Sequence, residues 1–103
     1  MILRHATPAR HVNSILRRGL LKAKSKGKRA AVWLCTACNA MWAAYHTVGR
    51  HGGRIEGVVV LEVDVPRSWL RRSRKGLWFC TRDIPPDRIC RLFGFVELAR
   101  AAG

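Results

Sequence analysis

The stretch Gly57–Pro66, GVVVLEVDVP, contains the clearest strand of the 103-residue chain, and the rest of the fold can be arranged around it. Successive side chains of a strand point to opposite faces of its sheet. Over residues 58–65, one face of the expected strand carries Val59, Leu61, Val63 and Val65. The other face carries Val58, Val60, Glu62 and Asp64. Pro66 ends the strand because it has no backbone N–H to donate to a neighbouring strand.

The composition indicates a folded protein. Hydrophobic residues make up 49% of the chain, which is enough for one domain, residues 1–103, with a modest core. No stretch approaches the roughly 18 consecutive apolar residues that a membrane span needs. The first residues also lack the basic-then-apolar layout of a signal peptide. We therefore expect a cytoplasmic protein without a membrane partner.

Charge is the most pronounced property of the chain. Twenty Lys and Arg residues against six Asp and Glu residues give a formal net charge of +14, and fifteen of the cations are Arg. Because Arg binds phosphate groups through two parallel hydrogen bonds, this balance predicts a polyanionic partner or substrate. Charge alone does not separate a DNA- or RNA-binding module from an enzyme with an anionic substrate.

The first third of the chain predicts two strands and one helix. Residues 2–6 form a short strand, and Thr7 caps a helix that Gly19 ends. Residues 22–29, KAKSKGKR, carry five cations without a large apolar side chain and are expected to form a solvated loop. Residues 30–35 follow as a second strand.

The remaining chain predicts one more helix and further strands. Thr36 caps a helix that runs to about Val48, and Gly49–Gly53 is expected to break it. After the strand at residues 58–65, a basic connector leads to a strand at 76–80 and a last strand at 89–98. This order predicts a small α+β domain, with its helices early and most of its sheet late.

Four cysteines offer three interpretations. Cys35 and Cys38 have the CxxC spacing of a zinc or redox site, whereas Cys80 and Cys90 provide no second pair with that spacing. We favour buried free thiols over zinc ligands or a disulfide. We therefore expect no metal site.

Several short patterns follow one another in a fixed order along the chain. They are His5-Ala6-Thr7, then Val32-Trp33-Leu34, then Gly49-Arg50-His51-Gly52 before Val58–Asp64, and finally Gly76-Leu77-Trp78-Phe79 with Ile84-Pro85-Pro86. This series resembles the catalytic lobe of the RNA (tRNA) 2′-phosphotransferases, which share the ADP-ribosyltransferase fold with the poly(ADP-ribose) polymerases. The resemblance spans about residues 2–90 and does not include the family's N-terminal RNA-binding lobe.

The resemblance implies a fold, a cofactor and a set of site residues. The fold would be a small ADP-ribosyltransferase-like one, with two early helices packed on a mainly antiparallel split sheet. The cofactor would be NAD, and the positions implied to bind it are His5, Ala6, Thr7, Trp33, Arg50 and Leu77. His5 and Arg50 would be catalytic: His5 would hydrogen-bond a ribose of NAD, and Arg50 would contact a phosphate.

The same resemblance gives the residues after Arg50 and the strand at 76–80 an expected role. Gly52 and Gly53 would let a backbone approach closely. Leu77 would take the apolar position that replaces the glutamate of the poly(ADP-ribose) polymerases.

Two residues depart from the family pattern. Ala6 stands where the family has a glycine whose backbone approaches the nicotinamide amide. Trp33 stands where the family has a histidine; its indole can stack on a ring but accepts no hydrogen bond. From the sequence, Trp33 is either a core residue or a stacking platform. His46 and His51 lie near the same positions without an identifiable partner.

Two hypotheses follow from these observations. In the first, the chain transfers ADP-ribose from NAD to a phosphate or base of a nucleic acid. Glu62 and Asp64 are expected to be structural and not general bases, so positioning of the reactants and stabilisation of their charge would carry the transfer step. In the second, it is a non-catalytic basic module that binds nucleic acid or an acidic protein. A third possibility, an effector that modifies a protein, has no specific residue in its favour. The residues expected to contact nucleic acid are Lys22, Lys24, Lys26, Lys28, Arg29, Arg71, Arg72, Arg74 and Lys75.

Overall fold

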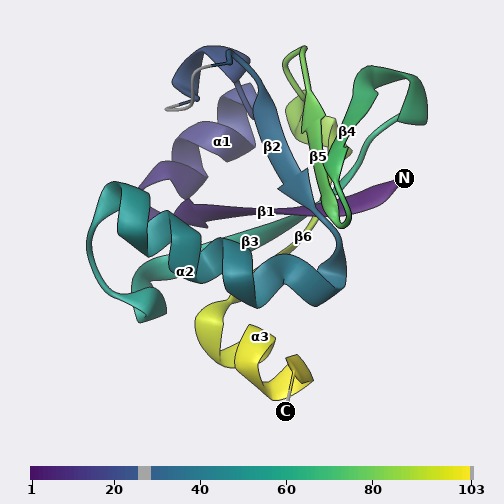
Figure 1. Cartoon of the computed structure of the whole chain (residues 1–103). Coiled ribbons are helices and arrows are strands. Elements are labelled where there is room, and N and C mark those ends of the chain that lie inside the picture. The colour runs from purple at the N-terminus through teal and green to yellow at the C-terminus, as the bar shows by residue number, and fades with distance from the viewer. Residues whose placement is uncertain (26–28, 103) are drawn as a thin grey trace.

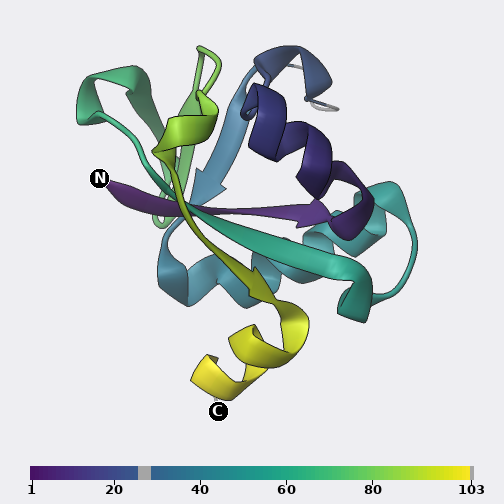
Figure 2. The same cartoon turned by 180° about the vertical axis from the view of Figure 1, so that it is seen from behind.

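The computed structural model of the chain describes residues 1–25 and 29–102. Its strands and helices are arranged around the strand that contains Leu61. Over these residues the chain is an α+β fold with three helices and one six-stranded antiparallel sheet (Figures 1 and 2). The strands are β1 (Ile2–Pro8), β2 (Val32–Cys35), β3 (Val58–Asp64), β4 (Leu70–Arg74), β5 (Leu77–Cys80) and β6 (Ile89–Gly94). The helices are α1 (Val12–Arg18), α2 (Ala40–His51) and α3 (Phe95–Ala102).

The sheet is nearly divided into two halves. Its strand order is β4-β5-β2-β1-β3-β6, and every neighbouring pair is antiparallel. β1 pairs with β3 along its whole length, from Ile2 to Pro8, but pairs with β2 only at Arg4↔Cys35. β2 and β5 therefore run at a steep angle to β1 in Figure 1. Beyond this single pair, β2 diverges from β1 and leaves space between the halves.

β3 contributes to two cores, one on each face of the sheet. Leu61, Val63 and Val65 are fully buried in one cluster, against which Val59 also packs. Val58 and Val60 belong to the second cluster. The predicted assignment of these side chains to two faces is confirmed for the apolar residues. Full burial of one such side chain contributes roughly 1.5–3 kcal/mol, which explains why this strand organises the fold.

The helices cover the two faces of the sheet. Ile15 of α1 packs against the first cluster, whereas Ala40 and Ala44 of α2 lie in the second cluster with Leu98 of α3. In Figure 1, α1 accordingly lies on one side of β1 and α2 and α3 lie on the other. The expectation of two early helices is met, and α3 is an additional element. The predicted last strand, residues 89–98, is wrong after Gly94, because Phe95 and Leu98 have the three-residue spacing of a helix face.

Two other predicted elements differ from the structure, one before the first helix and one at residues 70–74. Thr7 does not cap a helix: it lies within β1 and is 4% exposed, and α1 begins only at Val12. The predicted end of α1 at Gly19 is confirmed by its φ of +84°. Residues 70–74 form the edge strand β4 and not a connector, because they pair along β5.

α2 ends inside the predicted break at Gly49–Gly53, but later than the expected end near Val48. α2 continues through Gly49, Arg50 and His51 and ends at Gly52, whose φ is +77°. One glycine inside a helix costs only about 1 kcal/mol relative to alanine, so Gly49 does not stop it. Gly52 and Gly53 provide positive φ angles, but a Cβ at either would meet nothing within 4 Å. They therefore permit the bend of the chain and not a close backbone approach.

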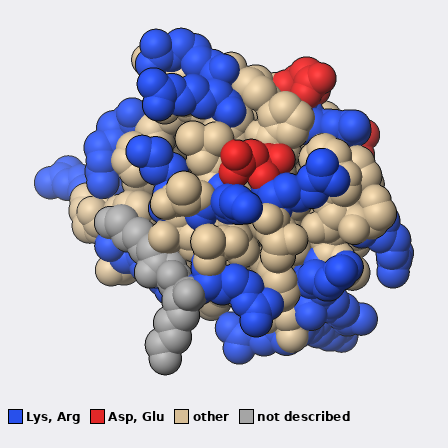
Figure 3. All heavy atoms as spheres, turned by 90° about the horizontal axis from the view of Figure 1, so that it is seen from above, with Lys and Arg blue, Asp and Glu red and all other residues tan. Residues whose placement is uncertain are grey.

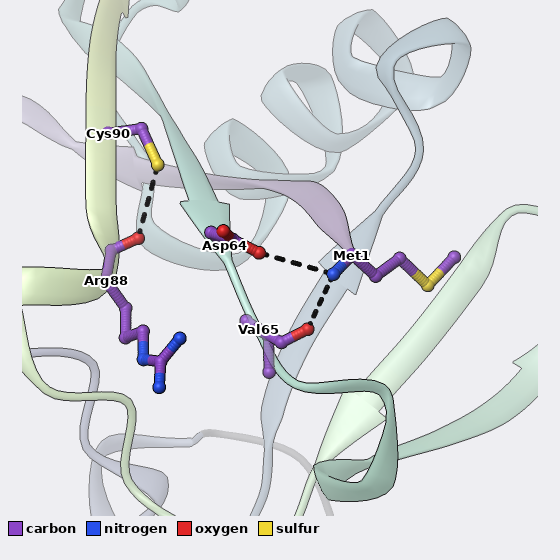
Figure 4. Close-up of polar contacts among 5 residues, drawn as sticks. All are labelled: Met1, Asp64, Val65, Arg88 and Cys90. Carbon is purple, nitrogen blue, oxygen red and sulfur yellow. Dashed lines mark hydrogen bonds and ion pairs between the residues drawn. The ribbon is translucent and has the colours of Figure 1, made fainter.

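Each of the two acidic residues of β3 forms an ion pair, one with the neighbouring strand β1 and the other with the N-terminus. Glu62 lies 3.5 Å from Arg4, its partner across β1 and β3. Asp64 lies 3.3 Å from the Met1 ammonium group, which also donates to the Val65 carbonyl at 2.9 Å (Figure 4). Both contacts fit the structural role expected of these carboxylates.

Candidate functional site

A cavity of about 760 Å³ lies where β2 diverges from β1. Its walls come from β1, β2, α1 and α2, with a contribution from the β4–β5 turn. The structure brings together at this cavity all six residues assigned to the cofactor: His5, Ala6, Thr7, Trp33, Arg50 and Leu77. These residues come from four separate parts of the sequence, so their convergence depends on the tertiary fold.

The lining of the cavity is basic. Among the described lining residues there is no Asp or Glu, and all four histidines of the chain are present. Five cations also line it, namely Arg4, Arg10, Lys24, Arg50 and Arg74. A concave site with cations of one sign raises the local concentration of anions. The cavity therefore favours an anionic ligand of small-molecule size.

His5 is held in one tautomer by the backbone of the neighbouring strand. Its Nδ1 lies 2.7 Å from the carbonyl oxygen of Trp33, and since that oxygen only accepts, Nδ1 carries the proton. Burial lowers the pKa of His5 below its usual 6.5, and the hydrogen bond to Trp33 acts in the opposite direction. The neutral ring leaves Nε2 as a hydrogen-bond acceptor, which suits a ligand hydroxyl group.

The backbone at Ala6 borders the space left by β2. The Ala6 carbonyl accepts a hydrogen bond from Thr47 Oγ1 of α2 at 3.4 Å, and both residues line the cavity. Thr7, the next residue, lines the cavity from within β1.

Trp33 forms an exposed wall of the cavity. Its side chain is 38% exposed and its ring is tilted against Phe79 of β5, with the ring centroids 5.2 Å apart. The guanidinium of Arg29 lies over the other aromatic ring, 4.5 Å from the Phe79 centroid. Trp33 is therefore exposed and is not a core residue. Its indole surface is available for stacking.

α2 presents a row of three polar and aromatic side chains to the cavity. Trp42 stacks on His46 with centroids 5.0 Å apart and an interplanar angle of 14°, and Arg50 Nε donates to His46 Nε2 at 3.1 Å. Spacings of four residues place these side chains one above the other on the helix. Trp42, which the sequence analysis did not single out, is 46% exposed. The four-residue spacing of Trp42, His46 and Arg50 is the signal that could have identified it.

The two remaining histidines also meet at the cavity. The rings of His11 and His51 are in edge-to-face contact, with centroids 5.6 Å apart. This contact joins α2 to the turn before α1, and both histidines line the cavity.

The residues expected to contact nucleic acid do not form one patch. Lys24 and Arg74 line the cavity, whereas Arg72 lies over Trp78 on the other face of the sheet, 5.9 Å from its ring centroid. Residues two apart in a regular strand share a face, so this separation follows from the register shift of β4 between Arg72 and Arg74. The other described members are exposed outside the cavity: Lys22, Arg29, Arg71 and Lys75. Lys26 and Lys28 lie outside the described residues.

All four cysteines are free thiols. Cys35 and Cys80 are buried as expected, but Cys38 and Cys90 are exposed, so the prediction of buried thiols is wrong for these two. Cys38 lies in the short turn before α2, outside the sheet. Burial is the main cause that raises the pKa of Cys35 to about 11. In residues 1–25 and 29–102, no group of three or more His, Cys, Asp or Glu side chains could hold a metal ion.

Comparison with protein families and with curated proteins found no match to this chain. Within the described part of the chain, the helices are too short or too polar to span a membrane.

Proposed function

We propose that the chain is an NAD-dependent ADP-ribosyltransferase-like domain that transfers ADP-ribose to a phosphate or base of a nucleic acid. One observation carries the proposal: the six positions that the resemblance assigns to NAD all line a single cavity. The volume of about 760 Å³ lies within the range of small-molecule sites. The nearly split sheet, joined at Arg4↔Cys35, provides the space for that cavity.

The lining residues fit the chemical groups of NAD. The cations and the lack of described carboxylates suit its two phosphates. His5 Nε2 can accept from a ribose hydroxyl, the Ala6 edge of β1 can meet the nicotinamide amide, and the exposed Trp33 indole can stack on the nicotinamide ring. When bound, NAD supplies the ribose–nicotinamide bond that breaks during transfer.

The side chains that line the cavity orient the reactants and neutralise their charge. None of these side chains is needed as a general base. A phosphate acceptor is already anionic, so it requires no carboxylate to remove a proton. Arg50 and Arg74 line the same cavity and can hold anionic groups of both reactants near each other. Orientation and charge stabilisation of this kind supply much of the acceleration in group-transfer reactions.

The surface outside the cavity supports a nucleic-acid partner in this proposal. Figure 3 shows Lys and Arg side chains spread over the visible face, with Asp and Glu confined to small areas. Nucleic-acid backbones bind such surfaces with release of counterions. Four free thiols also fit a reducing compartment, and we include a cytoplasmic location in the proposal.

An NMR titration with NAD tests the cofactor directly. The indole N–H signals of Trp33 and Trp42, which line the cavity, should shift. The indole signals of Trp69 and Trp78, which pack against the first core cluster and do not line the cavity, serve as internal controls. Equal shifts of all four indoles, or none at millimolar NAD, would overturn the proposal and leave the non-catalytic basic module.

Substitutions identify the residues that hold NAD. His5→Ala and Arg50→Ala should each weaken NAD binding at least tenfold, since a hydrogen bond to a charged or buried group is worth about 1.5–3 kcal/mol. Arg54→Ala is the matched control because Arg54 follows the same helix, is exposed and does not line the cavity. Release of nicotinamide in the presence of phosphorylated RNA then measures transfer.

A further inference from the structure

A second cavity of about 300 Å³ lies beside the first, at the start of α2. It is lined by Asn39, Trp42, Arg74, Lys75 and Leu77. Trp42, Arg74 and Leu77 line both cavities, so these three side chains form the boundary between them. The described lining of this smaller space is one aromatic ring, one amide, one apolar side chain and two cations, without a carboxylate.

Trp42 presents an ordered ring to this cavity. One neighbour of the indole is the stacked imidazole of His46, which in turn accepts a hydrogen bond from Arg50. These contacts along α2 fix the orientation of the indole, although the side chain remains 46% exposed. An exposed tryptophan with a fixed orientation is a platform on which a second flat ring can stack without loss of further side-chain freedom.

The two cations are positioned by the β4–β5 turn, which is fixed against the start of α2. The Gly76 carbonyl accepts from the Thr36 N–H at 3.1 Å and from Asn39 Nδ2 at 3.5 Å. Gly76 has a φ of +77°, and a Cβ there would overlap Asn39. Only glycine therefore lets the turn approach this closely, as Figure 1 shows for the tip of β4 and β5. The approach brings Arg74 and Lys75 to the same cavity as Trp42.

We propose that the second cavity binds one nucleotide unit of a single-stranded nucleic acid, with its base stacked on Trp42 and its phosphate held by Arg74 and Lys75. A single strand is required because a base inside a duplex has both faces covered by its neighbours. The role of this unit as acceptor rests on the proposed function, since Arg74 and Leu77 border the NAD cavity as well. Binding of the strand itself is independent of NAD.

Fluorescence anisotropy of a labelled single-stranded uridine hexamer tests this site, with all titrations run without NAD. Trp42→Ala should weaken binding roughly 5- to 100-fold, the usual effect of removing one base-stacking ring, and Trp42→Phe should restore most of it. Tyr45→Ala is the matched control: Tyr45 is an exposed aromatic residue of α2, 56% exposed, that lines neither cavity.

The cations are tested in the same assay through the salt dependence of binding. Lys75→Ala should weaken binding several-fold and reduce the slope of log Kd against log salt by about one. Arg17→Ala removes one positive charge from an exposed position of α1 that lines neither cavity, and it should change the slope less. A uridine-containing duplex of the same length should bind more weakly than the single strand.

Three results would overturn the inference. These are a change below twofold for Trp42→Ala, an equal loss for Tyr45→Ala, and displacement of the hexamer by AMP at the concentration at which unlabelled hexamer displaces it. The last result would identify a free mononucleotide as the ligand. Binding that depends on Trp42, together with no NAD binding by NMR, would support the nucleotide site and overturn only the proposed function.

Discussion

Substitution of Gly76 by alanine tests how firmly the β4–β5 turn is fixed to α2. A non-glycine residue at the observed positive φ costs roughly 1–2 kcal/mol. The new Cβ would also displace Asn39, which donates to Thr36 Oγ1 at 3.1 Å and to the Gly76 carbonyl at 3.5 Å. Each of these hydrogen bonds contributes about 0.5–1.5 kcal/mol. We therefore expect Gly76→Ala to lower the free energy of unfolding by roughly 2–4 kcal/mol.

A double-mutant cycle with Asn39→Ala separates the overlap from the backbone cost. Because Asn39→Ala removes the side chain that the new Cβ would strike, it should recover about 1–2 kcal/mol of the loss caused by Gly76→Ala. Gly52→Ala is the matched control: Gly52 has the same φ of +77°, lies at the other end of α2 and has nothing within 4 Å of an added Cβ. Its effect and that of Asn39→Ala should be additive.

Urea unfolding followed by tryptophan fluorescence provides the four free energies of each cycle. The denaturant slope should remain the same across the variants, because the surface exposed on unfolding does not change. A coupling free energy below about 0.5 kcal/mol between positions 39 and 76 would refute the reasoning, since distant, independent sites show values of that size. The same Gly76→Ala protein should bind the uridine hexamer more weakly than Gly52→Ala does.

Three further predictions concern the first cavity, the thiols and the core. Since burial lowers the pKa of His5, the contribution of its neutral ring to stability is complete above pH 6.5 and is lost as the pH falls below it. The urea midpoint should therefore decrease more between pH 7.5 and pH 5.5 for the wild type than for His5→Asn. A thiol reagent should label Cys38 and Cys90 in the native protein and all four thiols in denaturant; rapid native labelling of Cys35 would contradict its burial. Leu61→Ala, at a fully buried position, should cost about 2–5 kcal/mol in chemical unfolding, and a loss below 1 kcal/mol would contradict the assigned core.

The sequence identified the central strand and its two faces because a period of two in apolar residues is a local property. It also indicated the end of α1, since Gly19 supplies a backbone angle that other residues avoid. The extent of α2 could not be read in this way. Gly49 looks like a helix break, but burial of Ala44 and Thr47 against the sheet outweighs the small cost of one glycine.

The candidate site was only partly predictable from the sequence. The six positions that the resemblance assigns to NAD could be listed from the order of the motifs along the chain. That they meet at one cavity could not, because it depends on the divergence of β2 from β1. Trp42 was missed because an aromatic residue on a helix is normally assigned to a core. The β4–β5 turn places Arg74 and Lys75 beside Trp42, with Leu77 as the one apolar side chain of the smaller cavity.

The position of β4 at the end of the sheet has a consequence for self-association. An open strand edge can pair with the edge of another molecule and start aggregation. After buried Leu70, β4 exposes every remaining side chain, including Arg71, Arg72 and Arg74, and its pairing with β5 is irregular between Arg72 and Arg74. Repulsion between these arginines opposes the pairing of two such edges, so the same cations act against edge-to-edge self-association.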